Sequence, residues 1–576
     1  MADTVNKNLF GNPIQRILNI IRHDRNEFSS IYFYAILNGL IQLSLPLGIQ
    51  SIISFVLGGS FSTSLVLLIT LVVAGVYLNG MLDVNQKRII EKIQQKIFVR
   101  YSLEFSNRLP RLDLQAVDSY YLPELANRFF DTVSLQKGIS KLLLDIPGAS
   151  IQILFGLILL AFYHPIFIFF GFALLFIVYL ILRFTSAKGM ESSLLESDYK
   201  YAVAGWLEEL ARVVHSFKFS ANKNLNITKA DTLIQGYLKH RTTHFRVLLF
   251  QYWSLVGFKL AITAAMLIVG SLLLVNQQLN IGQFIAAEIV ILMVINSVEK
   301  LMGNLDTVYD VLTSIEKLDK LTEKPLEESG NIILERKDEG LSIELNHVTF
   351  SYNPEDTLHA AIKDINLNVH ANQKICIMGL TGSGKSSLIR IISGAYRHFA
   401  GSIYINKIPV QNYSTDSLRD QTGILLSRLD IFHGSLMENV TMGNTEITPQ
   451  HVLALAEKIG LGKFLSEQEL GLTTPIDPIG KKLSRNIRQK ILLLRALVNK
   501  PRLVLLEEPF EGLNAETIER IVNYIINEIP HVTVIISTTK EAYASRCDKV
   551  VYLEDGSILA EGPWNEIVQK INPRHS

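Results

Sequence analysis

Long apolar stretches in the first half of the chain restrict its fold more than any other feature. About six of them are long enough to cross the ~30 Å hydrocarbon core of a bilayer. They are residues 28–57, 61–82, 146–163, 166–182, 247–275 and 281–298. Because backbone polar groups find no water inside lipid, we expect these stretches to be transmembrane helices. The 48% hydrophobic content of the 576 residues agrees with a chain partly embedded in a bilayer.

The joints between these stretches predict how the chain is oriented in the membrane. Three joints, 58–60, 163–165 and 276–280, are short and contain no Lys or Arg. The other two are long and basic, with Lys and Arg spread over residues 87–111 and 218–241. By the positive-inside rule, the long joints and both termini face the cytoplasm. Pro, Asn and Ser interrupt the long joints near 118–127 and 217–229, where we expect short transverse segments.

Charge and cysteine content exclude other classes of function. The formal net charge is +1 and no long block of one sign occurs, so we expect no nucleic-acid partner. The two cysteines, Cys376 and Cys547, imply no disulfide framework and suit a reducing cytosol. The first residues show no secretory pattern, so we expect the N-terminus to be retained.

Two ionisable residues lie inside predicted spans, Lys259 in the fifth and Glu288 in the sixth. At ~1.5 Å rise per residue, Lys259 lies about 24 Å and Glu288 about 10 Å below the outer ends of their helices. We therefore do not expect them to pair directly. Two interpretations stay open: Lys259 reaches the cytoplasmic interface while Glu288 lines a wet vestibule, or these residues contact a substrate.

The second half of the chain has a different pattern. A charged stretch, 307–340, is followed from Leu341 by strand-like alternation and then by strands alternating with helices. This predicts an α/β nucleotide domain. We therefore expect a six-helix membrane domain over 1–306, a linker over 307–340 and a cytoplasmic α/β P-loop ATPase domain over 341–576.

A complete phosphate-loop motif, G-x-x-x-x-G-K-[ST], occupies residues 379–386, after an apolar strand pattern and before a helical one. Its glycines allow backbone N–H groups to surround phosphate, Lys385 reaches the β and γ phosphates, and the Ser386 hydroxyl ligates Mg²⁺. We expect ATP and Mg²⁺ as cofactors. The expected binding residues are Gly379, Thr381, Gly382, Ser383, Gly384, Lys385, Ser386 and Ser387.

Six spans, two long cytoplasmic joints and a phosphate-loop domain resemble a half-transporter of the ABC exporter family, in its type I arrangement. The resemblance implies that Tyr352 stacks on adenine. It also implies that Glu507, in place of the family's Asp, holds Mg²⁺, although its extra methylene moves the oxygens. Glu508, which follows Glu507 after an apolar strand, matches the catalytic base that polarises the attacking water.

The segment 483–487 aligns with the family's Leu-Ser-Gly-Gly-Gln signature but keeps only its first two residues. Ser484 is retained, whereas Arg485 and Asn486 replace the two glycines that let backbone N–H groups approach the γ-phosphate on the opposite subunit. We expect the two side chains to crowd that approach. In the alternative, the Arg485 guanidinium contacts the phosphate itself.

Three further motif positions depart from the family pattern. Ser427 replaces the glutamine that senses Mg²⁺ and touches the membrane half. Thr539 replaces the histidine that contacts the γ-phosphate, with Thr538 as the neighbouring choice. Asn514 replaces the Asp of the dimer contact, which keeps hydrogen bonding but removes a charge. Since removing one preorganised donor costs ~10²–10³ in rate, we expect two identical sites of this kind to hydrolyse ATP poorly.

The resemblance implies a multi-pass protein of the bacterial inner membrane that works as a dimer. The leading hypothesis is an exporter half that depends on a paralogous second half-transporter. The alternatives are a slowly hydrolysing homodimer and a nucleotide-sensing scaffold that transports nothing. Leu45-Pro46-Leu47 and Gln50 are similar to exporters of the protein- and peptide-secretion branch. The substrate class and the need for a periplasmic adaptor stay open.

Overall fold

The computed structural model describes residues 22, 24–58, 63–118, 120–221, 224–353, 360–427 and 430–571. The chain divides into two compact units. The first comprises Met1–Arg111 and Ser119–Lys324, and the second comprises Leu112–Asp118 and Pro325–Ser576. The boundary falls inside the stretch that we predicted as a linker, 307–340. Part of that stretch is a helix of the first unit, and the rest belongs to the second.

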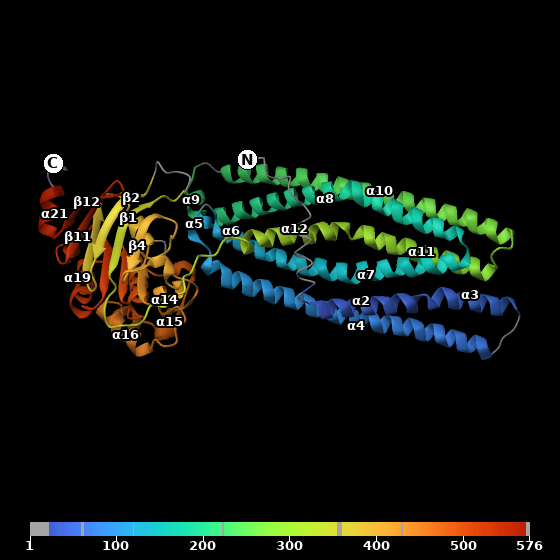
Figure 1. Ribbon diagram of the computed structural model, residues 1–576, viewed down its shortest axis with the longest axis horizontal. Helices are drawn as coiled ribbons and strands as arrows, with labels where there is room; N and C mark the ends of the chain where they lie inside the picture. Colours follow the sequence, from blue (N-terminus) through green and yellow to red (C-terminus); the bar gives the residue numbers. More distant parts are fainter. Residues whose placement is uncertain are drawn as a thin grey trace. The chain divides into compact units, whose positions relative to one another are not determined.

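Long helices build the first unit (Figure 1). In its described part the helices are α2 (Arg25–Gln42), α3 (Ser44–Leu57), α4 (Thr63–Arg108), α6 (Leu122–Asn127), α7 (Asp131–Tyr163), α8 (Ile166–Arg212), α9 (Val214–Lys218), α10 (Leu225–Val275), α11 (Ile281–Gly303) and α12 (Leu305–Thr322), with the short turns η1 (Leu109–Arg111) and η2 (Arg128–Phe130). They combine into six segments that are long and apolar enough to cross a membrane. The prediction of six spans is therefore confirmed. Most of the short joint at 58–60 lies outside the described residues.

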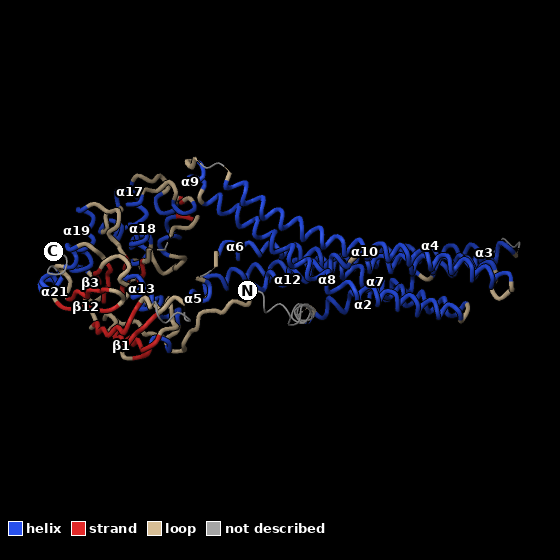
Figure 2. The backbone as a smooth tube through the Cα atoms, turned by 90° about the horizontal axis from the view of Figure 1, so that it is seen from above, coloured by secondary structure: helices blue, strands red, loops and turns tan. Residues whose placement is uncertain are grey.

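The helices continue far beyond the apolar stretches that identify them. α8 is 47 residues long and α10 is 51 residues long, and Figure 2 shows these two helices running side by side. The expected interruptions are also present. Near 118–127 the chain forms the short helix α6, and near 217–229 it forms α9 before α10 begins. Residues 222–223 of that second interruption lie outside the described part.

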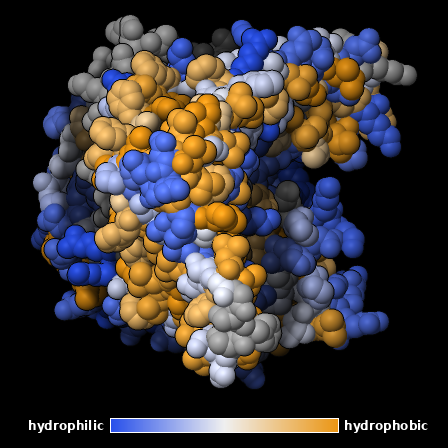
Figure 3. Space-filling view, turned by 90° about the vertical axis from the view of Figure 1, so that its right-hand side faces the viewer, coloured by the Kyte–Doolittle hydropathy of each residue, from blue (hydrophilic) through white to orange (hydrophobic). Residues whose placement is uncertain are grey.

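Apolar side chains of the first unit point both inward and outward. A buried cluster that includes Phe28, Ile93, Leu135 and Ile315 joins α2, α4, α7 and α12. Other large apolar side chains are exposed on the helices, among them Phe162 at 83%. Figure 3 shows that much of the surface seen from the end with the short joints is apolar. A contiguous apolar exterior on spanning helices is suited to lipid rather than to water.

Two sheets form the centre of the second unit. One is a four-stranded antiparallel sheet in the order β2-β1-β4-β5, and the other is six-stranded in the order β12-β11-β3-β10-β9-β6. The strands are β1 (Ile343–Phe350), β2 (Ile362–Val369), β3 (Lys374–Gly379), β4 (Ala400–Ile405), β5 (Ile408–Pro409), β6 (Thr422–Leu425), β9 (Leu503–Glu507), β10 (Thr533–Ser537), β11 (Lys549–Glu554) and β12 (Ser557–Gly562), with β7 (Gly434–Ser435) and β8 (Pro475–Ile476) as a separate pair. The predicted α/β architecture is confirmed.

Helices cover these sheets and leave strands β3, β9 and β10 fully buried. The helices are α13 (Lys385–Ile392), α14 (Thr415–Asp420), α15 (Leu436–Thr441), α16 (Pro449–Lys458), α17 (Gly462–Ser466), α18 (Arg485–Leu497), α19 (Ala515–Asn523), α20 (Glu541–Ala544) and α21 (Trp564–Ile571), with the turns η3 (Val410–Asn412), η4 (Gly471–Thr473), η5 (Pro478–Gly480) and η6 (Tyr524–Glu528). Strands buried on both faces explain the continuous apolar runs in the sequence.

The strand register brings distant parts of the sequence to one edge of the larger sheet. β3, β10, β9 and β6 are parallel, and Ser537 of β10 is paired with both Ile377 and Glu507. Their carboxyl ends therefore lie together. In open α/β sheets ligands bind outside this edge.

A short segment from the first long joint, Leu112–Asp118, belongs to the second unit and contains α5 (Leu114–Val117). The Asp113 backbone N–H donates to the carbonyl of Pro325 at 3.1 Å. Its carboxylate lies 3.4 Å from His398 Nε2. The Gln115 amide donates to the Ser351 carbonyl at 3.4 Å. The nucleotide unit thus holds a piece of chain that connects two membrane spans.

Candidate nucleotide site

The phosphate loop joins β3 to α13, as the motif predicts. Gly379, Gly382 and Gly384 have φ of +145°, +87° and +98°, a region that favours glycine. A Cβ on Gly384 would also lie only 2.7 Å from the Ala361 carbonyl oxygen. The loop therefore needs glycine for its backbone path as well as for space.

The polar side chains of the loop differ in how they are bonded. Lys385 Nζ donates to the carbonyls of Gly379 and Leu380, at 2.8 and 2.9 Å. Burial lowers the pKa of Lys385, and the nearby Glu508 charge opposes this. The Ser383 hydroxyl is buried without a hydrogen-bond partner among the described residues, whereas Thr381 is exposed. The loop thus holds the Lys385 ammonium against its own carbonyls and keeps one buried hydroxyl without a described partner.

Glu507 ends β9 and is 4% exposed. It accepts hydrogen bonds from the Ser427 backbone N–H at 3.0 Å and from the Ser427 hydroxyl at 2.9 Å. Burial alone would raise the pKa of Glu507, but hydrogen bonds from Ser386 and Ser427 and the Arg390 charge lower it overall. The carboxylate is therefore ionised and oriented. With the Ser386 hydroxyl it offers oxygen ligands of the kind that Mg²⁺ prefers.

The structure joins two residues that sequence analysis interpreted separately as departures from the family pattern. By that alignment, Glu507 stands in place of a shorter Asp and Ser427 in place of a longer Gln. The longer carboxylate reaches the shorter hydroxyl directly. Arg390 lies beside both, 3.7 Å from Glu507 and 3.4 Å from the Ser427 hydroxyl. Sequence reasoning missed Arg390, although its spacing of four residues from Ser386 places both on one helix face.

Glu508 follows β9 with φ +43°, a backbone conformation that is costly for a residue with a side chain. Its N–H donates to the Ser537 carbonyl at 2.9 Å, and the Gln489 amide donates to its carbonyl at 3.3 Å. Burial raises the pKa of the Glu508 carboxyl, and the charges of Glu511 and Glu507 act in the same direction. A raised pKa suits a general base that works near neutral pH.

Thr539 contacts the Glu508 carboxylate through the Thr539 backbone rather than its side chain. The Thr539 N–H donates to the Glu508 carboxylate and partly offsets the upward shift of its pKa. The Thr539 side chain itself is exposed. The neighbouring Thr538 is buried, and its hydroxyl accepts from the Lys540 N–H at 3.1 Å. Neither threonine supplies an imidazole or a cation at this place.

The signature segment is bound to its own chain. Ser484 caps α18, its hydroxyl accepting from the Ile487 N–H at 3.3 Å. Arg485 forms an ion pair with Glu511, and its stem lies over Gly512, where an added Cβ would lie 3.3 Å from Arg485 Cγ. The Asn486 Oδ1 atom is buried and accepts no hydrogen bond from a described residue. Of the two interpretations of Arg485, phosphate contact would require it to leave Glu511.

Asn514 and Tyr352 are also engaged within the chain. Asn514 is the N-cap of α19, with Oδ1 accepting from the Thr517 N–H at 3.0 Å. The Tyr352 hydroxyl lies 2.9 Å from Ser387 Oγ and accepts from Arg390 at 3.3 Å. Its half-buried ring makes an edge contact with Phe350, with centroids 5.0 Å apart. The ring is thus fixed beside the phosphate-loop helix.

Lys259 of α10 forms an ion pair with Glu299 of α11, a residue that sequence reasoning missed. From the helical rise, Glu299 lies about 27 Å below the start of α11, close to the depth of Lys259. The depth comparison that argued against Glu288 would have identified Glu299. Glu288 is half-buried.

Two family models match the chain. The ABC transporter model matches residues 362–511, and the ABC transporter transmembrane region model matches residues 29–298. The chain is also similar in fold to a bacterial Atm1-family ABC exporter with ATP bound. The TM-score is 0.82 and the sequence identity is 16%, over 95% of this chain and 96% of that one.

Several curated proteins are similar in sequence. The glutathione/L-cysteine transport system protein CydC of Haemophilus influenzae is 31% identical over 46% of this chain and 45% of its own length. A putative export ATP-binding/permease protein of Rickettsia felis is 27% identical over 66% of this chain and 65% of its own length. The alpha-hemolysin translocation protein HlyB of Escherichia coli is 26% identical over 63% of this chain and 51% of its own. The chain thus spans about half to two thirds of these relatives.

Both units of the structure are therefore matched, each by a model of the same family. The nucleotide domain of that family binds ATP with Mg²⁺ in general, and the six apolar segments make this a multi-pass membrane protein. The resemblance inferred from the motifs is confirmed. The chain belongs to the ABC transporter family, as a half-transporter with the fold of an ABC exporter and with membrane region and nucleotide domain fused in one polypeptide.

Proposed function

We propose that this chain is one half of a dimeric ABC exporter that binds MgATP and depends on a second, different half for rapid hydrolysis. The observation that carries the proposal is a contrast within the second unit. The phosphate loop, Ser386 and Glu507 are arranged for MgATP, whereas Arg485 pairs with Glu511 of its own chain. The chain binds well but serves the opposite nucleotide poorly.

In this proposal each polar group of the phosphate-loop side has one task. Lys385 moves from the carbonyls of Gly379 and Leu380 to phosphate oxygens. Ser386 and Glu507 would hold Mg²⁺, and the ion would supply positive charge to neutralise the phosphates. Glu508 takes up proton density from the attacking water, and its raised pKa assists that step.

The segment Leu112–Asp118 supports coupling between the nucleotide unit and the spans. Asp113 and Gln115 bind His398 and the Ser351 carbonyl, and Ser351 immediately precedes Tyr352. Only a few bonds therefore connect the nucleotide, through Tyr352 and Ser351, to the joint between the second and third spans. We expect this segment to transmit nucleotide state to the membrane helices.

The test is ATP hydrolysis in lipid nanodiscs, with the purified chain alone and with the second half that co-purifies with it. We expect the chain alone to turn over at least about 100-fold more slowly than the mixed assembly. Brisk turnover by the chain alone, abolished by Glu508→Gln, contradicts the need for a partner. It would favour a homodimer, which the well-positioned Glu508 supports.

A transport assay distinguishes the nucleotide-sensing scaffold from both kinds of exporter. Inverted vesicles that contain the mixed assembly should accumulate substrate only with ATP, and Glu508→Gln in this chain, whose phosphate loop faces the partner's signature, should stop this. Hydrolysis without any movement of substrate would favour the scaffold.

A further inference from the structure

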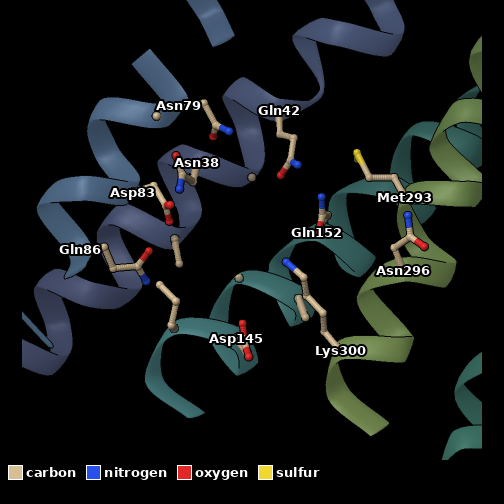
Figure 4. A pocket seen from close by; sticks show the side chains of 16 residues that line it. Asn38, Gln42, Asn79, Asp83, Gln86, Asp145, Gln152, Met293, Asn296 and Lys300 are labelled. Carbon is tan, nitrogen blue, oxygen red and sulfur yellow. The ribbon is translucent and has the colours of Figure 1, made fainter. Parts of the chain in front are cut away.

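A polar cavity of about 480 Å³ lies in the membrane unit, between α2, α4, α7 and α11 (Figure 4). Its walls are rich in carboxamides: Asn38, Gln42, Asn79, Gln86, Gln152 and Asn296. Its apolar wall positions are small or flexible, and no aromatic ring is among the described residues that line it. The size is typical of small-ligand pockets, which span about 300–1,000 Å³, but the polarity is unusual for them.

The depth of these residues places the cavity in the cytoplasmic half of the membrane. Counting ~1.5 Å per residue from the outer helix ends, Gln152 lies about 16 Å, Asn296 about 22 Å and Gln86 about 35 Å below them. The hydrocarbon core is ~30 Å thick. The carboxamides therefore extend from the middle of the core to the cytoplasmic interface, where polar residues cost energy and usually serve function.

Three of the wall amides have buried atoms that bond to no described residue. These atoms are Asn38 Oδ1, Asn79 Oδ1 and Gln86 Nε2, and Gln86 is only 3% exposed. Figure 4 shows their side chains grouped on the wall formed by α2 and α4. A buried polar atom without a partner destabilises the fold. The set includes two acceptors and one donor, so a complementary ligand must both donate and accept hydrogen bonds.

On the opposite wall, formed by α7 and α11, hydrogen bonds to residues outside the cavity orient the polar side chains. The Ser297 hydroxyl donates to Gln152 Oε1 at 2.6 Å, which leaves the Gln152 NH₂ group as a donor. Asp145 accepts from the Asn304 amide at 2.9 Å. On the α4 wall, Asp83 pairs with Lys87 at 3.1 Å. Lys300 makes no ion pair within the described part of the chain, and Figure 4 shows its ammonium directed toward Gln152. Lys300 is thus a positive wall charge available to an anionic ligand group, while the Asp145 carboxylate on the same side bonds to the neutral Asn304 amide.

We propose that this cavity binds the exported substrate before transport, and that the substrate is a hydrophilic peptide segment whose carboxylate meets Lys300. Peptide amides donate and accept along their whole length, as the wall carboxamides do. Aromatic cations and lipid tails fit poorly, because the former need aromatic rings and the latter an apolar groove. The proposal rests on the proposed export function, since it names the cargo class of the same transporter.

The test is direct binding to the full chain in nanodiscs without ATP. The probes are two mixtures of isotopically labelled tetrapeptides of Gly, Ser, Ala and Glu. In one mixture all carboxyl groups are free acids, and in the other every carboxyl group, at the C-terminus and in the side chains, is an amide. We expect the free acids to bind roughly 10- to 100-fold more tightly, because a charged partner strengthens a hydrogen bond. Equal binding of both mixtures, or binding of neither, overturns the proposal.

Matched variants assign the effect to the cavity. Lys300→Met should remove the preference for free acids, whereas Lys188→Met should leave it unchanged. Lys188 is exposed on α8 about 33 Å below the helix start, a similar depth, but does not line the cavity. MgATP binding should be equal in all variants and reports that the fold is intact. A Lys300→Met chain that keeps the preference overturns the proposal.

Gln86→Leu distinguishes a binding role from a structural one. Replacing an unpartnered buried amide by an apolar group should maintain or raise the melting temperature, while peptide binding weakens roughly 10-fold. Unchanged peptide binding in this variant contradicts the proposal. Rapid hydrolysis by the chain alone would overturn the partner requirement but would leave these binding results as they are, so the two failures are distinguishable.

Discussion

The phosphate-loop side and the signature side of the nucleotide unit both contain residues that we interpreted as departures from the family pattern, but these residues are bonded in different ways. On the phosphate-loop side, the Ser427 hydroxyl donates to the Glu507 carboxylate at 2.9 Å, so these two positions share one contact. On the signature side, Arg485 binds Glu511, and Ser484 and Asn514 cap their own helices. On one side the two residues contact each other beside the phosphate loop, and on the other the polar groups bond to their own helices or to the loop after β9.

This contrast shows that motif identity and site integrity are separate properties. A substituted residue that forms a new contact at the ligand site keeps its role in ligand binding. A substituted residue that forms its contact elsewhere loses that role. The first kind stays coupled to nucleotide, so mutating it changes binding. The second kind is coupled only to its own helix, so restoring the family residue should add activity.

The largest expected effect concerns the phosphate-loop side. Lys385→Ala should weaken MgATP binding roughly 100-fold or more, because two charge-assisted hydrogen bonds to phosphate are lost. Calorimetric titration of the chain in nanodiscs measures this directly. Lys463→Ala is the control, since Lys463 is 90% exposed on α17. Retained affinity in Lys385→Ala would mean that the loop does not hold the phosphates.

The next effect concerns the signature side and has the opposite sign. The triple substitution Arg485→Gly, Asn486→Gly and Thr539→His should raise hydrolysis by the chain alone by about 10-fold or more, because phosphate donors return. Phosphate release in nanodiscs provides the measurement. The control Glu511→Gln frees Arg485 without removing it, and we expect no comparable gain. If the triple variant stays as slow as the original, neither the two signature residues nor the missing histidine beside Glu508 limits turnover.

The paired change on the phosphate-loop side gives a smaller effect that a double-mutant cycle detects. Glu507→Asp and Ser427→Gln should each weaken Mg²⁺-dependent ATP binding roughly 10-fold, because each alone breaks the contact between the two side chains. The double variant, which restores the family's pair, should recover most of this loss. Additive losses in the double variant would show that the two positions are independent.

Much of this fold was predictable, because its signals are long or local. Six spans follow from apolar length, and the phosphate loop follows from glycines that have positive φ. The missed contacts, such as Lys259 with Glu299 and Arg390 with Glu507, join residues far apart in sequence. No local pattern pairs these residues directly, although helical depth points to Glu299 and the four-residue spacing from Ser386 places Arg390 on the helix face of the site. The Arg485–Glu511 pair was missed for the same reason, since it depends on how α18 lies against the loop after β9.

The smallest expected effect tests the electrostatics of Glu508. Burial raises the pKa of Glu508, and the Glu511 charge raises it further, so hydrolysis should fall on acidification at a higher pH than for an exposed glutamate. Glu511→Gln removes one negative charge and should lower that pKa. The acid limb of the rate profile should then move to lower pH, by less than about one pH unit.

The pH dependence of the hydrolysis rate is measured at saturating MgATP, in whichever assembly hydrolyses ATP. Under this condition every variant has its site filled, so differences in nucleotide affinity do not affect the rate. Glu516→Gln is the control, since Glu516 is exposed on α19 and pairs with Arg520. A shift of the acid limb in Glu511→Gln but not in Glu516→Gln would link the two sides of the site through charge. A shift to higher pH would show that Glu508 is not the titrating base, and that Glu511 acts on the rate only by holding Arg485.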